Sequence, residues 1–343
     1  MKVSIDESNS IKGLLISLVV LGHNTIFSSI VPESIYYFLY SFHVACFFIL
    51  PFFYDLKGEN TVMGGVIKYF KRLYWPYVWC FVLLSILNQL FIGYGVLPDL
   101  TPDYVNKASL FGFFKTILNG SFYDIRTYAG FQYLWFLPAM CSMSVLKLLY
   151  ETYHSLRIPL LVLGSIFYII FWVFMFKKPY DISFNYQLMQ WSVFSFMLGL
   201  GVLFMGRTAS GIICRFDKTS VKWFYLLSFI LLNSIYFFTS NGGEINRPMF
   251  WTIRVLNPLL AMGLLISFVS IYCCKALQNI GKRSLYIYLI HLPLSTIICM
   301  VLSKYINQVL ALFVSYVLTM TISYFLADFV KKIPFINKSF FPR

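Results

Sequence analysis

Charge is scarce in this sequence. Asp, Glu, Lys and Arg make up 12% of the 343 residues, whereas an ordinary soluble domain carries roughly 25%. Hydrophobic residues make up 59%, and the aromatic share is 20%, with 37 Phe and 25 Tyr. A soluble fold could not hide that much apolar surface. The composition therefore excludes a soluble domain and predicts a chain whose solvent is lipid.

Several catalytic and metal-binding motifs are also missing. The sequence has no Gly-x-Ser-x-Gly elbow, no His-Glu-x-x-His zinc helix and no phosphate-binding loop of the Gly-x-x-x-x-Gly-Lys type. These absences argue against the hydrolases and pumps that use such motifs. The seven cysteines lack the paired spacing of a zinc site or a disulfide framework, and we interpret them as small core residues. We predict no metal site.

Acidic residues are fewer than basic ones, 13 against 27, for a net charge of +14. A nucleic-acid binder would gather its basic residues on one face of a soluble domain, but here they lie between apolar runs. We therefore expect no nucleic-acid partner. If the N-terminus is cytoplasmic, 19 of the 27 Lys and Arg residues fall on the cytoplasmic side. Because cytoplasmic loops carry the basic excess, both termini are predicted to be cytoplasmic.

Ten apolar runs are long enough to span a bilayer, which takes about 20 mostly apolar residues. They are Ile11–Ile30, Ile35–Leu56, Leu73–Tyr94, Gln132–Tyr150, Ile158–Phe176, Tyr186–Gly206, Trp223–Ser240, Phe250–Cys274, Ser284–Ser303 and Gln308–Val330. The sequence predicts an all-α, polytopic integral membrane bundle of about ten transmembrane helices, forming a single domain over residues 1–343. Because most connections are short, consecutive helices should pack as antiparallel neighbours.

One connection is long, at about residues 95–131, and it is external in this topology. It mixes aromatic residues with carboxylates: Tyr104, Tyr123, Tyr128, Asp99, Asp103 and Asp124. Aromatic faces beside carboxylates would suit a sugar. A loop that only caps the bundle explains the same composition equally well.

Three of the four histidines lie inside predicted spans: His23 in the first, His43 in the second and His291 in the ninth. A charge at depth in a bilayer costs about 2.5–3.5 kcal/mol on insertion scales, so an ionisable residue there is a candidate functional group. The fourth, His154, falls in a cytoplasmic loop, where we expect no special role.

Lys12 and His23 are eleven residues apart on one predicted helix. At 100° per residue this spacing returns to within about 20° of the same face, with a rise of about 16 Å. The face would carry a cation at the cytoplasmic mouth and an imidazole deep in the membrane. The separation is close to the length of a pantetheine arm, so a phosphate held near Lys12 would leave a thioester close to His23.

His43 lies at a depth similar to that of His23, because each is seven or eight residues from the outer end of its predicted helix. Two such histidines on adjacent helices suit acid–base or acyl-handling chemistry, with neutral imidazole as the base for a hydroxyl. A hydrogen bond across a helix interface is the alternative. Arg72 is the better phosphate-binding candidate of a basic cluster with Lys57, Lys68 and Lys71, because it abuts an apolar run and Arg suits bidentate phosphate contacts.

Several motifs, in order along most of the chain, resemble the acyltransferase 3 family of membrane acyltransferases. They are Ile11-Lys12-Gly13 with Val19-Val20-Leu21-Gly22-His23, Ser41-Phe42-His43 with Phe47-Phe48, Arg72-Leu73 with Pro76-Tyr77, Leu134-Trp135-Phe136-Leu137-Pro138, and Ser284-Leu285-Tyr286-Ile287-Tyr288-Leu289-Ile290-His291. The departures are Asn9 where an Asp is common, Lys12 where many members have Arg, and Pro51-Phe52 in place of a small Ser-Gly pair.

The resemblance implies a ten-helix bundle in the inner membrane of a bacterium that uses cytoplasmic acetyl-CoA. The acceptor would be a hydroxyl of a surface carbohydrate or its precursor, such as O-antigen or capsule. By resemblance, Lys12 and His23 are the paired essential positions, with His43, Arg72, Trp135 and His291 as lesser candidates. We assign His23 and His43 to catalysis, Lys12 and Arg72 to the donor, and Trp135 and His291 to the acceptor.

Two routes are open for His23, which would either deprotonate the acceptor hydroxyl or carry the acyl group briefly. The alternative function is a glycan or small-anion transporter, in which buried histidines relay protons. Helices broken by Gly or Pro at matching places in two halves would favour the transporter, and the sequence shows no such matched pair.

Overall fold

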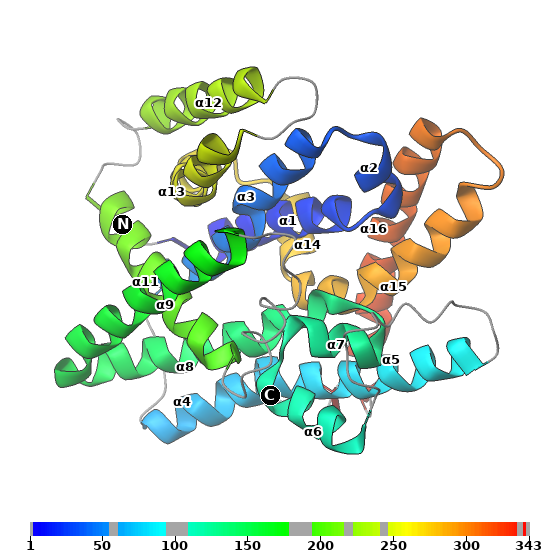
Figure 1. Cartoon of the computed structure of the whole chain (residues 1–343), viewed down its shortest axis with the longest axis horizontal. Helices are drawn as coiled ribbons and strands as arrows, with labels where there is room; N and C mark the ends of the chain where they lie inside the picture. Colours follow the sequence, from blue (N-terminus) through cyan, green and yellow to red (C-terminus); the bar gives the residue numbers. More distant parts are fainter. Residues whose placement is uncertain are drawn as a thin grey trace. The chain divides into compact units, whose positions relative to one another are not determined.

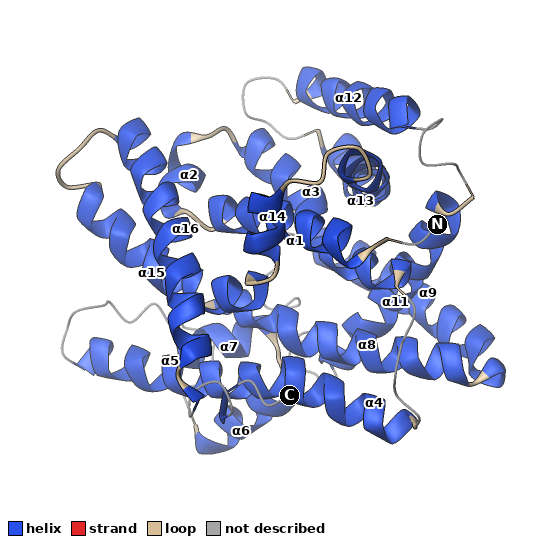
Figure 2. Ribbon diagram, turned by 180° about the vertical axis from the view of Figure 1, so that it is seen from behind, coloured by secondary structure: helices blue, strands red, loops and turns tan. Residues whose placement is uncertain are grey.

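The computed structural model describes residues 3–54, 61–93, 109–177, 194–215, 222–240, 246–334 and 339–340. Within these ranges all regular structure is helical, as Figures 1 and 2 show, which confirms the predicted all-α fold. The main described helices are α1 (Ile5–Gly22), α2 (Thr25–Ile30), α3 (Glu33–Ile49), α4 (Val62–Tyr69), α5 (Trp75–Gly93), α6 (Leu110–Asn119), α7 (Phe122–Ala129), α8 (Phe136–Thr152), α9 (Arg157–Lys177), α11 (Phe194–Ile213), α12 (Lys222–Thr239), α13 (Arg247–Val269), α14 (Lys275–Gly281), α15 (Ser284–Leu302) and α16 (Gln308–Lys332).

Eight helical segments of the described ranges are long and apolar enough to cross a membrane. They are Glu33–Phe53, Val62–Leu90, Tyr133–Thr152, Phe194–Ile213, Lys222–Thr239, Pro248–Ile271, Ser284–Leu302 and Gln308–Lys332. The other two predicted runs fall on α1 and α9. α1 carries Asp6, Glu7 and Lys12 within 18 residues, and α9 is 21 residues long, with its apolar stretch counted over His154–Ile170. The chain is a multi-pass membrane protein.

Helix α1 starts six residues before the predicted Ile11 because of a local cap that the hydropathy pattern does not reveal. The backbone N–H of Ser4 donates to the Glu7 carboxylate at 2.7 Å, and the Glu7 N–H donates to the Ser4 hydroxyl at 3.2 Å. This reciprocal pair is a capping box, which satisfies two N–H groups that have no partner inside the helix.

The predicted first run is also not one helix, because α1 ends at Gly22 and α2 starts at Thr25. Asn24 causes the break. Its side-chain oxygen accepts from the N–H groups of Ile26 at 3.0 Å and Phe27 at 3.2 Å, and so starts a new helix. Asn24 is 1% exposed, which agrees with the rule that irregular backbone at membrane depth must be buried in protein.

The third predicted run, Leu73–Tyr94, starts 11 residues too late. The helix begins at Val62, where the Thr61 hydroxyl accepts the Gly64 N–H at 3.1 Å. It continues through a π-helical turn, η2 (Phe70–Tyr74), into α5. Pro76 explains the turn, because proline has no N–H for the carbonyl four residues earlier and its ring crowds that carbonyl. The Trp75 N–H bonds instead to the Phe70 carbonyl.

The chain divides into two compact units, which are described separately. The first, here called unit 1, comprises Met1–Asp55 and Gly206–Lys332. The second, unit 2, comprises Leu56–Met205 and Ile333–Arg343.

In unit 1, the connection after α13 contains a helix, α14, that packs backbone to backbone against α1. A Cβ added at Gly13 would lie 2.1 Å from the Leu277 carbonyl oxygen, and one added at Gly281 would lie 1.8 Å from the Asn9 carbonyl oxygen. Only glycine permits two such approaches. The segment between the eighth and ninth predicted spans is therefore helical and packs on the N-terminal half of α1.

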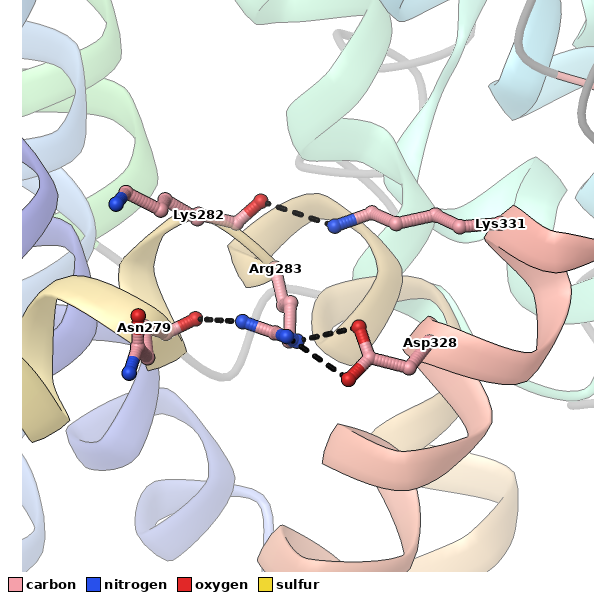
Figure 3. Close-up of polar contacts among 5 residues, drawn as sticks. All are labelled: Asn279, Lys282, Arg283, Asp328 and Lys331. Atoms are coloured by element: carbon pink, nitrogen blue, oxygen red, sulfur yellow. Dashed lines mark hydrogen bonds and ion pairs between the residues drawn. The ribbon is translucent and has the colours of Figure 1, made fainter.

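Helices α15 and α16 lie side by side in unit 1 (Figures 1 and 2). The guanidinium of Arg283 bonds to both oxygens of Asp328, at 2.7 and 2.8 Å, and to the Asn279 carbonyl at 2.9 Å (Figure 3). It also lies 4.3 Å from the Tyr324 ring centroid. A bidentate pair of this kind has directional geometry, so it holds Arg283, the residue immediately before α15, against the last turns of α16.

In unit 2, the described part of the long predicted loop forms α6 and α7 rather than an open loop. Two of the side chains expected to face a sugar, Tyr128 and Asp124, make contacts inside the unit. Tyr128 donates to the Ser109 carbonyl at 3.0 Å and packs its ring 5.6 Å from Phe113. Asp124 is buried and accepts from the Asn119 amide at 3.4 Å. Asp99, Asp103 and Tyr104 lie outside the described residues.

Candidate functional site

Three histidines from three helices are linked by ring contacts in unit 1, two of them through Tyr40. The ring of His23, at the end of α1, lies 5.2 Å from that of His291 in α15 and 5.9 Å from that of Tyr40 in α3. Tyr40 lies in turn 4.8 Å from His43, one turn along α3. The sequence therefore predicted correctly that His23 and His43 lie close together. His291, which we had assigned to the acceptor, is the imidazole in direct ring contact with His23.

Hydrogen bonds to the backbone determine which nitrogen of each histidine carries its proton. Nδ1 lies 2.9 Å from the Val19 carbonyl in His23, 2.5 Å from the Leu39 carbonyl in His43 and 2.7 Å from the Tyr288 carbonyl in His291. Because a carbonyl oxygen only accepts, each neutral imidazole must be protonated at Nδ1 and must keep its lone pair on Nε2. Each ring therefore presents a basic nitrogen away from its own helix.

The three histidines differ in access. His43 and His291 are 0% exposed, whereas His23 is only partly buried. The Nε2 atom of His43 has no hydrogen-bond partner among the described residues. Of the three, only His23 keeps part of its surface exposed; His291 is in ring contact with it, and His43 lies on the other side of Tyr40.

Two residues that the sequence analysis did not select, Tyr40 and Asn24, hold His23 in place. The Tyr40 hydroxyl donates to the Gly22 carbonyl at 3.0 Å, a group that the helix break leaves without its next helical donor. Asn24 donates to the Ser315 hydroxyl at 2.7 Å, and the Cys299 thiol donates to the Asn24 oxygen at 3.4 Å. The strong N-cap preference of Asn was the signal available in the sequence.

Lys12 lies in the same unit, eleven residues before His23 on α1. Its side chain is half-buried, and its ammonium lies 5.9 Å from the centroid of the Tyr54 ring. The Tyr54 hydroxyl donates to Ser8 on the first turns of the same helix. Since α1 is unbroken from Ile5 to Gly22, the predicted rise of about 16 Å between Lys12 and His23 holds.

The remaining two candidates, Arg72 and Trp135, belong to unit 2. Arg72 is exposed and lies in the π-helical turn before α5. Trp135 is half-buried at the end of a short 3-10 helix, η3 (Gln132–Trp135), with its ring 6.2 Å from Phe136. Unit 1 thus brings together four of the six predicted residues.

One family of known proteins matches this chain. The sequence model of the acyltransferase domain family, type 3, matches residues 5–328, which is nearly the whole chain. The chain belongs to the acyltransferase 3 family. Comparisons with curated proteins and with solved structures find no match.

Membership of the acyltransferase 3 family makes the chain a membrane acyltransferase. The matched range includes the histidine cluster, Lys12, Arg72 and Trp135. The transporter alternative gains no support from this family, and the break in α1 is explained locally by the Asn24 cap.

Proposed function

We propose that this acyltransferase moves an acetyl group from cytoplasmic acetyl-CoA to a hydroxyl of a bacterial surface carbohydrate or its precursor. The observation that carries the proposal is the state of His23: partly exposed, protonated at Nδ1 by its bond to the Val19 carbonyl, and about 16 Å along one helix from Lys12. A cation and a base at that separation suit the two ends of a CoA thioester.

The proposed reaction uses His23 as a general base. Nε2 takes the proton of the acceptor hydroxyl while the hydroxyl oxygen attacks the thioester carbonyl. The carbon–sulfur bond then breaks, and the CoA thiolate leaves with its electron pair and takes up a proton. A thiolate is a good leaving group, so the step needs no strong acid.

The neighbours of His23 support this role. His291, with its ring 5.2 Å from that of His23, supplies a second imidazole to which the proton that His23 accepts can pass, and His43 supplies a third beyond Tyr40. Lys12 contributes electrostatic anchoring of a donor phosphate near the cytoplasmic boundary, and Arg72 of unit 2 is a second candidate for a phosphate contact. The excess of basic residues on one side supports cytoplasmic termini in the inner membrane.

Replacement of His23 tests the proposal. Full-length protein reconstituted in lipid nanodiscs is incubated with labelled acetyl-CoA and a glycan extract, and free CoA thiol and acetylated glycan are measured together. Positioned base catalysis supplies about 10² to 10⁴ in rate, so His23→Ala should lower transfer by about that factor.

His154→Ala is the matched control, because His154 lies outside the cluster beside Arg157. It should behave as the wild-type protein does. Transfer by His23→Ala at the wild-type rate would remove His23 from the chemistry. If the wild-type protein released no CoA with any of the carbohydrates tested, the proposed reaction would be refuted.

A further inference from the structure

A continuous series of aromatic rings leads from the start of α13 to the histidine cluster in unit 1. Ring centroids are 6.2 Å apart for Trp251 and Phe250, and 5.2 Å apart for Phe250 and Tyr37. They are 5.7 Å apart for Tyr37 and Tyr36, and 4.5 Å apart for Tyr36 and Tyr40. Tyr40 in turn contacts both His23 and His43.

These rings are not closed inside a packed core. Tyr36, Tyr37, Tyr40, Phe250 and Trp251 are each only partly buried. Phe38, the next aromatic residue along α3, instead packs against Phe229 and Phe237 of α12. Tyr36 and Tyr40, four residues apart, therefore lie with His43 on one side of α3, while Phe38 lies on the side that packs on α12.

Charged groups border the outer end of the series. Glu33 is exposed and lies three residues before Tyr36 and four before Tyr37, a spacing that places it on the same side of α3. Arg254, four residues after Phe250 on α13, lies with its guanidinium 5.3 Å from the Phe250 ring centroid. A carboxylate and a guanidinium thus lie beside partly exposed aromatic rings.

We propose that this series, Tyr36, Tyr37 and Trp251 with Glu33 and Arg254, is the binding surface for the sugar ring that accepts the acyl group. A pyranose has an apolar C–H face, which stacks on aromatic rings, and hydroxyl groups, which bond to charged and phenolic groups at the edge. This inference rests on the proposed function and adds to it the place where the acceptor binds.

The path length suits the inference. Along α3, Tyr36 lies four residues before Tyr40 and seven before His43, or about 6 Å and about 10 Å in rise. A sugar stacked on Tyr36 would therefore reach the accessible His23 with one of its hydroxyls. The surface lies at the end of α1 opposite to Lys12, so donor and acceptor approach the base from opposite sides.

The competing occupant of such a surface is the lipid headgroup region, where aromatic residues form belts. Trp223 at the first turns of α12 provides the matched control. It is 61% exposed, has Lys222 over its ring at 5.8 Å, and lies at the opposite end of the α12–α13 pair from Trp251. An aromatic belt would make the two tryptophans equivalent, whereas a sugar site would not.

The experiment measures acetyl transfer to methyl glycosides of glucose, galactose, mannose and N-acetylglucosamine, with full-length protein in nanodiscs. Tyr36→Ala and Trp251→Ala should each raise the KM for the accepted glycoside between about twofold and tenfold. Neither should change the KM for acetyl-CoA. Tyr36→Phe, which keeps the ring, should remain within about twofold of the wild-type acceptor KM.

The outcomes separate the inference from the proposed function. The sugar-binding surface would be refuted if both alanine variants kept the wild-type acceptor KM. It would also be refuted if Trp251→Ala and Trp223→Ala raised the acceptor KM equally. Neither result would contradict the proposed function. Failure of the wild-type protein to acetylate any glycoside would overturn both as stated. Saturation-transfer spectra of the glycosides with His23→Ala protein give a second readout, since binding should persist there and should weaken when Tyr36→Ala is added.

Discussion

Removal of the Asn24 side chain should damage catalysis from a position that touches no substrate. Asn24→Ala deletes the acceptor of the Ile26 and Phe27 N–H groups and the donor to Ser315. The substitution leaves the aliphatic packing almost unchanged. Its effect should therefore report on the helix break itself and on the histidine placed beside it.

The magnitude follows from the burial of the groups left without partners. An N-cap is worth about 0.5–2 kcal/mol where water can replace it. Ile26 is 6% exposed and Phe27 is 8% exposed, so water does not reach their N–H groups, and each unmet buried donor costs about 1–3 kcal/mol. We expect a loss of about 2–4 kcal/mol of stability, and a shift of His23. A shift of about 1 Å can cost about 10² in rate.

The assay compares kcat, the KM for acetyl-CoA and the unfolding temperature of the same nanodisc preparations. Asn24→Ala should lower kcat by about one to two orders of magnitude with little change in the KM for acetyl-CoA, because Lys12 lies about 16 Å along α1 from His23, far from the helix break. Asn24→Ser retains a capping oxygen and should recover part of the loss. Ser315→Ala removes one hydrogen bond and should have a smaller effect. Wild-type kcat and stability in Asn24→Ala would refute this reasoning.

Three further predictions concern other groups. Tyr40→Phe keeps the ring contacts but removes the bond to the Gly22 carbonyl, so kcat should fall by up to about tenfold, as a hydrogen bond of about 0.5–1.5 kcal/mol allows; an unchanged kcat would contradict the positioning role. Lys12→Arg should keep most activity while Lys12→Ala raises the KM for acetyl-CoA, and equal values in all three forms would exclude Lys12 from the donor site. Burial raises the pKa of the Asp124 carboxyl above its ordinary value of 3.8, so the stability it contributes is complete below that value and is lost as pH rises through the raised pKa. Unfolding temperatures across the acidic range should therefore decline with pH less steeply in Asp124→Asn than in the wild-type protein.

The histidine cluster shows how far local patterns predict a site. The spacing of Lys12 and His23 was predictable because α1 is a regular helix, in which residue number converts directly into rise and angle. The proximity of His43 followed from the short connection between two helices. The contact between His23 and His291 joins residues 268 positions apart. The hydrophobic periodicity of the sequence does not indicate which face of α15 packs toward α1. Tyr40 escaped notice because an aromatic residue in an apolar run is usually core packing.

The errors at helix ends have a different cause. The predicted boundaries came from hydropathy, which measures transfer into lipid, whereas helices begin and end where backbone groups find caps. Ser4 with Glu7 starts α1 in a polar stretch, and Asn24 interrupts an apolar one. Both caps depend on short-range hydrogen bonds of single side chains, which a hydropathy average over many residues does not detect.

The sequence alone determined that the chain is a membrane protein, because its long apolar runs are stable only when lipid surrounds them. It also determined the separation of Lys12 and His23, because both residues belong to one helix. Tertiary structure decided which rings surround His23, how α14 packs on the glycines of α1, and which side of α3 stays accessible beside the histidines. These features depend on contacts between helices distant in the chain, whose rotation and register are selected by packing rather than by local propensity.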